Sequence, residues 1–125
     1  MVVRGLSPDE VDRIFRGLAD ATRRDIVEQV LREAQSISTL ARRYDMSFAA
    51  VQKHVAVLER AALVTKQRRG REQLVHGNPE ALQRAARLLA DYERIWRHRV
   101  RVIEDILAED APGGDPQNPE ERTEP

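Results

Sequence analysis

Apolar residues recur at helical spacing through the first half of the chain, and they predict four short helices at about 8–18, 21–34, 37–44 and 48–61. A side chain that can cap a helix precedes each of them: Ser7, Asp20, Ser36 and Ser47. Only Asp45-Met46 separates the third helix from the fourth. The pattern therefore predicts a helix, a tight turn and a second helix over residues 36–63.

The hydrophobic period changes after Leu63. Two short strands are predicted at 63–67 and 71–76, joined at Arg68-Arg69-Gly70, where Gly70 supplies the positive φ that a hairpin bend often needs. The expected product is a basic β-hairpin. The alternative is a solvated loop whose charges only keep it soluble.

A single long helix is predicted from Pro79 to about residue 108, with apolar positions seven residues apart. Thirty helical residues span roughly 45 Å, whereas a domain of this size has a radius of gyration of about 14 Å. Part of the apolar stripe therefore needs another partner, and a second copy of the chain is the simplest one. Alternatively the helix folds back over its own core. Arg99 interrupts the stripe, so an extended coiled coil is not expected.

Composition divides the 125 residues into three parts. Residues 1–6 are expected to form a flexible arm, 7–108 one domain with a modest core, and 109–125 an acidic, Pro- and Gly-rich disordered tail. There is no cysteine, which excludes disulfides and thiolate metal sites. The first residues are too polar for a signal peptide, and no apolar run approaches the roughly 20 residues of a membrane span. A soluble, cytoplasmic protein without membrane contact is predicted.

The charges are unevenly distributed although the net charge is zero. Residues 36–77 contain eight Lys and Arg against three Asp and Glu, and residues 104–125 contain one Arg against eight acids. The surplus of five positive charges coincides with the two predicted short helices and the hairpin. Because the local field decides encounter with a polyanion, this region is a candidate for nucleic-acid binding.

No catalytic constellation is found, so an enzyme is not expected. The three histidines, His54, His76 and His98, lie on different predicted elements, and there is neither a phosphate-binding Gly-rich loop nor zinc-ligand spacing. Asp91 and His98 are seven residues apart, beyond the spacing that joins two ligands on one helix. A metal shared across a dimer stays open as an alternative, and no cofactor is predicted.

The helix at 48–61 has an apolar stripe on one side and small or polar residues on the other, which is typical of a helix that enters a DNA major groove, although any amphipathic surface helix shares this pattern. Gln52 can bond an adenine edge and Lys53 a guanine or a phosphate, while Phe48 can contact a thymine methyl or instead turn inward. His54 is expected to hold the turn or touch a phosphate. Basic hairpin residues would neutralise phosphates. The candidate DNA-binding residues are Arg42, Arg43, Ser47, Phe48, Ala49, Gln52, Lys53, His54, Lys66, Arg68, Arg69 and Arg71.

Several short motifs, in order, resemble those of ArsR-family winged helix-turn-helix regulators. They are residues 18–27 (LADATRRDIV), 36–41 (SISTLA), 46–47 (MS), 53–55 (KHV), 57–59 (VLE) and 62–64 (ALV), and the resemblance covers about residues 14–103. It implies a mainly α fold of five helices with a two-stranded wing, and dimerisation through the first and last helices. The implied interface residues are Val11, Ile14, Phe15, Leu89, Tyr92, Trp96 and Ile103.

The resemblance also implies operator binding and transcriptional repression, often of the protein's own promoter. Two departures argue against metal sensing: residues 36–41 contain no cysteine, and Asp91 and His98 do not reproduce the metal-binding pairs of the last helix. The expected function is a homodimeric repressor that reads an inverted repeat in double-stranded DNA, with an unknown inducer. The alternative is a winged-helix module used only for protein contact, docking through its last helix.

Overall fold

The computed structural model describes residues 7–110, which form five helices and three strands. The order is α1 (Pro8–Leu18), α2 (Ala21–Arg32), β1 (Gln35–Ser36), α3 (Ile37–Tyr44), α4 (Phe48–Arg60), β2 (Val64–Arg69), β3 (Glu72–Gly77) and α5 (Pro79–Asp110). The chain divides into two units, one ending at Leu88 and one beginning at Leu89. The first contains α1 to β3 and the start of α5, and the second contains the rest of α5.

The predicted helix starts are confirmed by their capping bonds. The backbone N–H of Glu10 donates to the Ser7 hydroxyl at 3.2 Å while Ser7 N–H donates to the Glu10 carboxylate at 2.8 Å, which is a complete capping box. Asp20, Ser36 and Ser47 cap α2, α3 and α4 through backbone N–H groups three residues on. These interactions are local, so sequence spacing alone identifies them.

The sheet has one strand more than expected. β2 and β3 form the predicted hairpin, with Val64 opposite Gly77 and Arg69 opposite Glu72. The two-residue β1 adds to the outer edge of β3, which gives the antiparallel order β1-β3-β2. The prediction of a two-stranded wing was therefore incomplete, because two residues are too few to show an alternating pattern. β1 also explains why α2 ends at Arg32, two residues earlier than predicted.

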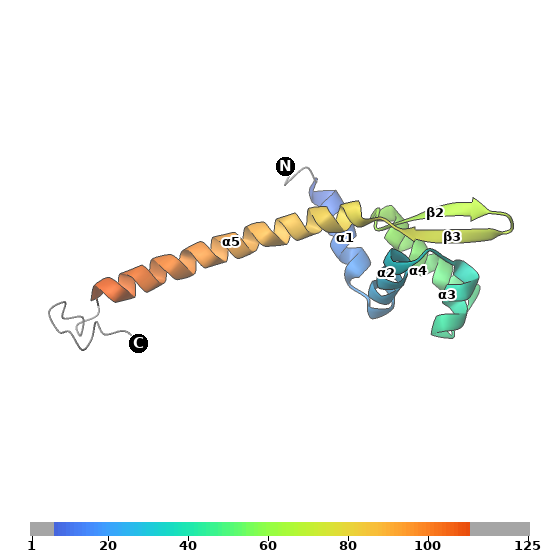
Figure 1. Cartoon of the computed structure of the whole chain (residues 1–125), viewed down its shortest axis with the longest axis horizontal. Helices are drawn as coiled ribbons and strands as arrows, with labels where there is room; N and C mark the ends of the chain where they lie inside the picture. The colour runs from blue at the N-terminus through green and yellow to red at the C-terminus, as the bar shows by residue number, and fades with distance from the viewer. Residues whose placement is uncertain (1–6, 111–125) are drawn as a thin grey trace. The chain divides into compact units, whose positions relative to one another are not determined.

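The core of the first unit is aliphatic and lies where α1 to α4 meet the sheet (Figure 1). The back of α4 is its centre, since Val51, Val55 and Leu58 are fully buried against Ile26 and Leu40. At roughly 25 cal/mol for each Å² of apolar surface buried, such side chains supply the main stabilisation of the fold. This packing fixes which side of α4 faces solvent.

α5 extends to Asp110, so Glu109 and Asp110 belong to a helix and not to the predicted tail. The predicted arm, 1–6, and the remainder of the predicted tail, 111–125, lie outside the described residues. None of the helices in residues 7–110 has an apolar stretch long enough to cross a membrane.

Candidate nucleic-acid interface

The turn between α3 and α4 has the sharp geometry that a helix-turn-helix requires. Asp45 adopts a left-handed conformation with φ 54° and ψ 46°, which Asp tolerates better than most residues. The backbone N–H of Met46 donates to the carbonyl of Ala41 at 3.0 Å and so satisfies the end of α3. The predicted turn at Asp45-Met46 is confirmed, and only residues 45–47 separate α3 from α4.

The solvent side of α4 presents the predicted recognition residues. Ser47 caps the helix, and Phe48, Ala49, Gln52 and Lys53 are all exposed. Phe48 is 47% exposed, so its ring is not turned into the core. The side chains that could read bases therefore stand on one surface, on the opposite side of the helix from its buried stripe.

His54 lies on the flank of α4 that faces the α1–α2 corner. Its Nδ1 is 3.5 Å from Nη1 of Arg23 and 4.0 Å from a carboxylate oxygen of Asp20. Arg23 also donates to the carbonyls of Gly17 and Arg16, both at 2.9 Å, and so closes the end of α1. These contacts favour the first of the two predicted roles, in which His54 holds the motif in place.

The two arginines of α3 differ in their surroundings. Arg42 is exposed and makes a long contact of 3.4 Å to the Thr39 hydroxyl. Nε of Arg43 lies 3.3 Å from the Asp25 carboxylate, and its guanidinium lies 5.7 Å from the centre of the Tyr44 ring. Part of the charge of Arg43 is therefore matched within the protein, and Arg42 is the better candidate for a phosphate contact.

A small polar cluster joins α3 to α2. Asp25 accepts hydrogen bonds from Tyr44 and Arg43, which lower the pKa of its carboxyl despite partial burial. Burial, followed by the bond to Asp25, raises the pKa of Tyr44 to about 12. The hydrogen bond to Asp25 likewise raises the pKa of Arg43. Sequence reasoning missed Asp25, because its partners are 18 and 19 residues away in the chain.

The tip of the β2–β3 hairpin is basic and open. Arg68, Arg69 and Arg71 are exposed around Gly70, whose φ of +64° confirms the predicted turn geometry. Lys66 is different, since its Nζ lies 3.4 Å from the Glu59 carboxylate and so ties the wing to α4. The three tip arginines are therefore better candidates for phosphate contact than Lys66.

The residues expected at a dimer interface fall into two groups. Ile14 is only 2% exposed and packs in the core of its own chain, so its predicted place at an interface is not supported by its burial. Val11 is partly buried against the same core, while Phe15 is 36% exposed. The α5 candidates of the second unit, Leu89, Tyr92, Trp96 and Ile103, are all exposed. Among residues 7–110, no three His, Cys, Asp or Glu side chains gather in a way that could hold a metal ion.

Three comparisons with known proteins agree on the class of protein to which this chain is similar. Residues 18–67 match a helix-turn-helix domain family. The chain is 33% identical over 104 residues to the HTH-type transcriptional regulator Rv2034 of Mycobacterium tuberculosis, covering 83% of this chain and 92% of that protein. The structure of an ArsR-like transcriptional regulator from Rhodococcus sp. RHA1 is similar with a TM-score of 0.70 and 33% identity, covering 78% of this chain and 92% of that one.

A solution structure from Mycobacterium bovis, described as the homodimeric winged helix-turn-helix DNA-binding domain of Mb0332, is similar in fold with a TM-score of 0.55. It is 22% identical, covering 71% of this chain and 80% of that one. Fold and site together define a winged helix-turn-helix domain that binds DNA and regulates transcription. The chain belongs to the ArsR family of such regulators. The comparisons thus favour the predicted DNA-binding regulator over a module used only for protein contact.

Proposed function

We propose that the protein is a homodimeric transcriptional repressor that binds an inverted-repeat operator, including one at its own promoter. The observation that carries this proposal is the exposed front of α4, where Gln52 and Lys53 stand on a helix whose back is fully buried. Such a helix is rigid enough to place donors at base edges. In this proposal α4 enters the major groove and the wing contacts the flanking backbone.

Recognition would be shared between side chains that read the bases and side chains that position the protein on the DNA backbone. The Gln52 amide offers a bidentate pair to adenine, and Lys53 reaches guanine or a phosphate, at about 1–3 kcal/mol of discrimination for a good bidentate contact. Arg42, Arg68, Arg69 and Arg71 would neutralise phosphates irrespective of sequence. The affinity would accordingly fall as the salt concentration rises.

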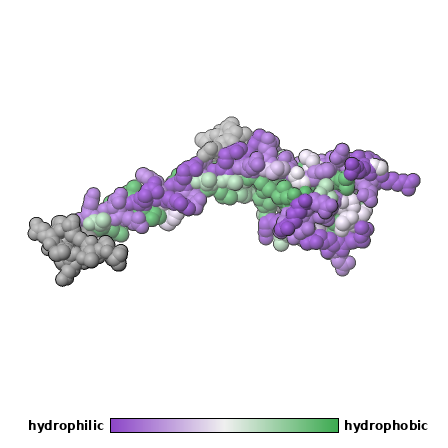
Figure 2. Space-filling view, viewed as in Figure 1, coloured by the Kyte–Doolittle hydropathy of each residue, from purple (hydrophilic) through white to green (hydrophobic). Residues whose placement is uncertain are grey.

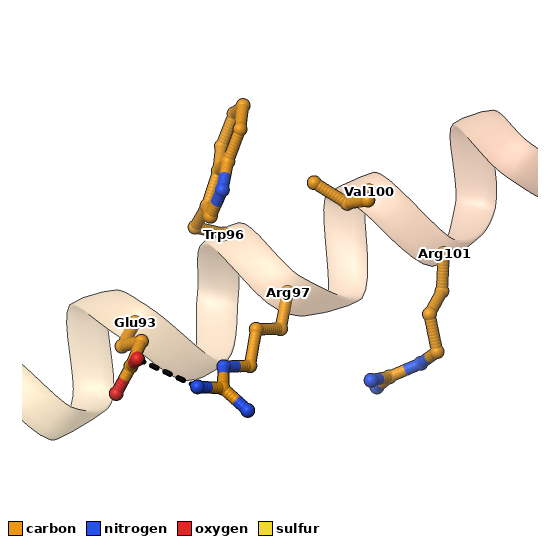
Figure 3. Close-up of a pocket in the computed structure, with 5 residues that line it drawn as sticks. All are labelled: Glu93, Trp96, Arg97, Val100 and Arg101. Atoms are coloured by element: carbon orange, nitrogen blue, oxygen red, sulfur yellow. Dashed lines mark hydrogen bonds and ion pairs between the residues drawn. The ribbon is translucent and has the colours of Figure 1, made fainter.

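The proposed dimer is supported by the apolar side of the second unit. Green patches mark hydrophobic residues on this part of α5 (Figure 2), and Trp96 is 61% exposed although it is the chain's single tryptophan. The Trp96 ring extends from the helix in a different direction from the ion pair of Glu93 and Arg97 (Figure 3), although all three side chains border one hollow. A face of this kind gains free energy by burial against a second copy. Two-fold symmetry would then present two recognition helices to half-sites about 34–36 Å apart.

The test begins with selection of bound genomic fragments and footprinting, which define the operator and the half-site spacing. Affinity for that operator is then measured for Gln52→Ala and Lys53→Ala, with Gln83→Ala on the exposed side of α5 as the matched control. We expect losses of about tenfold or more for the first two variants together with altered base preference. If both bind the operator like the parent chain, the recognition face is misassigned.

A further inference from the structure

A hollow of about 190 Å³ lies between α1 and α4 in the first unit, apart from the recognition front. Arg13 and Arg16 of α1 and Val57 and Arg60 of α4 line it. The two helices approach closely beside it, because Gly17 has no side chain: a Cβ there would lie 3.0 Å from the buried side chain of Leu63. Both helices thus contribute arginines to the lining of this small space, and Val57 contributes an apolar side chain.

Two of the three arginines that line this hollow, Arg16 and Arg60, have no acidic partner within residues 7–110. No carboxylate of the described residues lines the hollow. Glu10 lies near Arg13, but its carboxylate accepts the backbone N–H of Ser7 at 2.8 Å. Arg16 and Arg60 therefore bring positive charge to the hollow without an acidic partner among residues 7–110, and a bound anion would be attracted to that charge.

We propose that this hollow binds a small organic anion, a carboxylate or phosphate group joined to a compact apolar body, which serves as an effector of the proposed repressor. Guanidinium groups bind such oxygens through paired, charge-assisted hydrogen bonds. Val57 supplies apolar contact for the body of the ligand. The volume suits a molecule of about the size of a substituted benzene ring, and too little space remains for a nucleotide.

The site is connected to DNA recognition through α4. Arg60 follows Lys53 by seven residues, so both lie on the same side of the helix about two turns, or roughly 10 Å, apart. That distance is comparable to the Debye length at 0.1 M salt, so an anion at Arg60 lowers the positive potential at Lys53. The effector therefore weakens operator binding, and by linkage the operator weakens effector binding to the same degree.

The first experiment follows anion binding to the full chain without DNA. Benzoate and phenyl phosphate are titrated while nuclear magnetic resonance reports the Val57 methyl groups and the arginine Nε–H groups. We expect saturable shifts at the four lining residues. The double variant Arg13→Gln/Arg16→Gln should bind about tenfold more weakly or worse, and Arg87→Gln, an exposed arginine of α5, should bind like the parent chain. Absence of a saturable shift with both probes, or equal binding by the double variant, would overturn the proposal.

The second experiment separates this inference from the proposed function on which its regulatory part rests. Operator affinity is measured with each probe and with potassium chloride of equal ionic strength. A larger loss with the probe, absent in the double variant, supports the effector. An equal loss of operator affinity with probe and with salt overturns the regulatory role. It is also overturned if the double variant binds DNA weakly without probe, because the arginines of the hollow would then contact DNA phosphates directly. Failure to bind any operator overturns the proposed function, while the anion titration still decides whether the site exists.

Discussion

The Tyr44 hydroxyl donates a hydrogen bond of 2.5 Å to Oδ2 of Asp25, and this bond joins the last residue of α3 to the middle of α2. Nε of Arg43 approaches the same oxygen at 3.3 Å. Two neighbouring residues of α3 thus meet one carboxylate just before the turn into α4. The cluster fixes the helix that precedes the recognition helix, so it links the stability of the fold to the placement of the DNA-binding surface.

Replacing Tyr44 by Phe should lower the free energy of unfolding by about 1 kcal/mol. Hydrogen bonds to charged groups are worth about 1.5–3 kcal/mol. We expect about 1 kcal/mol here because Asp25 is partly exposed to solvent, which weakens the interaction. Urea denaturation followed by circular dichroism measures the change. Gln83→Ala, at an exposed position of α5 outside the proposed interface, is the control and should leave the midpoint unchanged. Equal midpoints for the two variants would show that the bond contributes nothing.

The same cluster predicts how stability depends on pH. The folded pKa of Asp25 is lowered, chiefly by the Tyr44 hydrogen bond, so its contribution is present above the unfolded pKa of about 3.9 and is lost as pH falls through the lower folded value. Wild type should therefore lose stability relative to Asp25→Asn on acidification. Unfolding measured at several pH values in both proteins would test the sign.

Alkaline titration gives the complementary prediction for Tyr44. Its folded pKa of about 12 exceeds the ordinary value of about 10, so its contribution is present below pH 10 and is lost as pH rises through 12. In Tyr92→Phe, Tyr44 is the only remaining tyrosine, and its ionisation is followed by near-ultraviolet absorbance. Far-ultraviolet circular dichroism at each pH confirms that the chain is folded. A midpoint near 10 in the folded protein would contradict the burial of this group.

The structural features that could be predicted from the sequence are local or periodic. Caps at Ser7, Asp20, Ser36 and Ser47 lie within three residues of their partners, and the buried stripe of α4 repeats every three or four positions. Both signals are visible in a short window, so helix starts and the exposed front of α4 were predictable. Membership of the family was visible for the same reason, since its motifs are short and ordered.

What the sequence did not reveal depends on distant neighbours. β1 exists only because Gln35 and Ser36 meet Val75 and Leu74 across the chain. The sequence makes Arg43 a candidate DNA-binding residue, but its partner Asp25 is 18 residues away in the chain, and His54 lies against Arg23, 31 residues earlier. Ile14 and Phe15 belong to the same apolar stripe of α1 in the sequence. Only the packing shows that Ile14 lies in the core and Phe15 at the surface.

Gly77→Ala should destabilise the fold by about 1–3 kcal/mol. A Cβ at Gly77 would lie 2.7 Å from Cδ2 of Leu31 and 2.9 Å from its backbone Cα, so a rotamer change of Leu31 cannot relieve the clash. Thermal unfolding of Gly77→Ala and of Gly77→Ala/Leu31→Ala tests this, with Leu31→Ala as the reference. Full rescue in the double variant would mean that only the flexible side chain is in the way.

Arg69→Ala should weaken binding to all DNA sequences about equally. Arg69 is exposed at the end of β2, beside the hairpin turn, where it can meet a phosphate but has no fixed base edge to read. Loss of one phosphate contact lowers the slope of log affinity against log salt by about 0.9. Titrations of operator and unrelated DNA over a salt series measure both quantities. A loss confined to the operator would instead assign Arg69 to base readout.

Trp96→Ala should weaken the proposed dimer by about 2 kcal/mol or more, since a large aromatic side chain at the centre of an interface is a typical hot spot. Sedimentation equilibrium over a range of concentrations measures the dissociation constant. Arg97→Ala is the neighbouring control, because Arg97 is engaged in an exposed ion pair of 2.7 Å with Glu93 and contributes no apolar surface of comparable size (Figure 3). We expect Arg97→Ala to dimerise like the parent chain. Should Arg97→Ala dissociate while Trp96→Ala does not, the two chains would meet through the charged side of α5, and the apolar stripe would need a different partner.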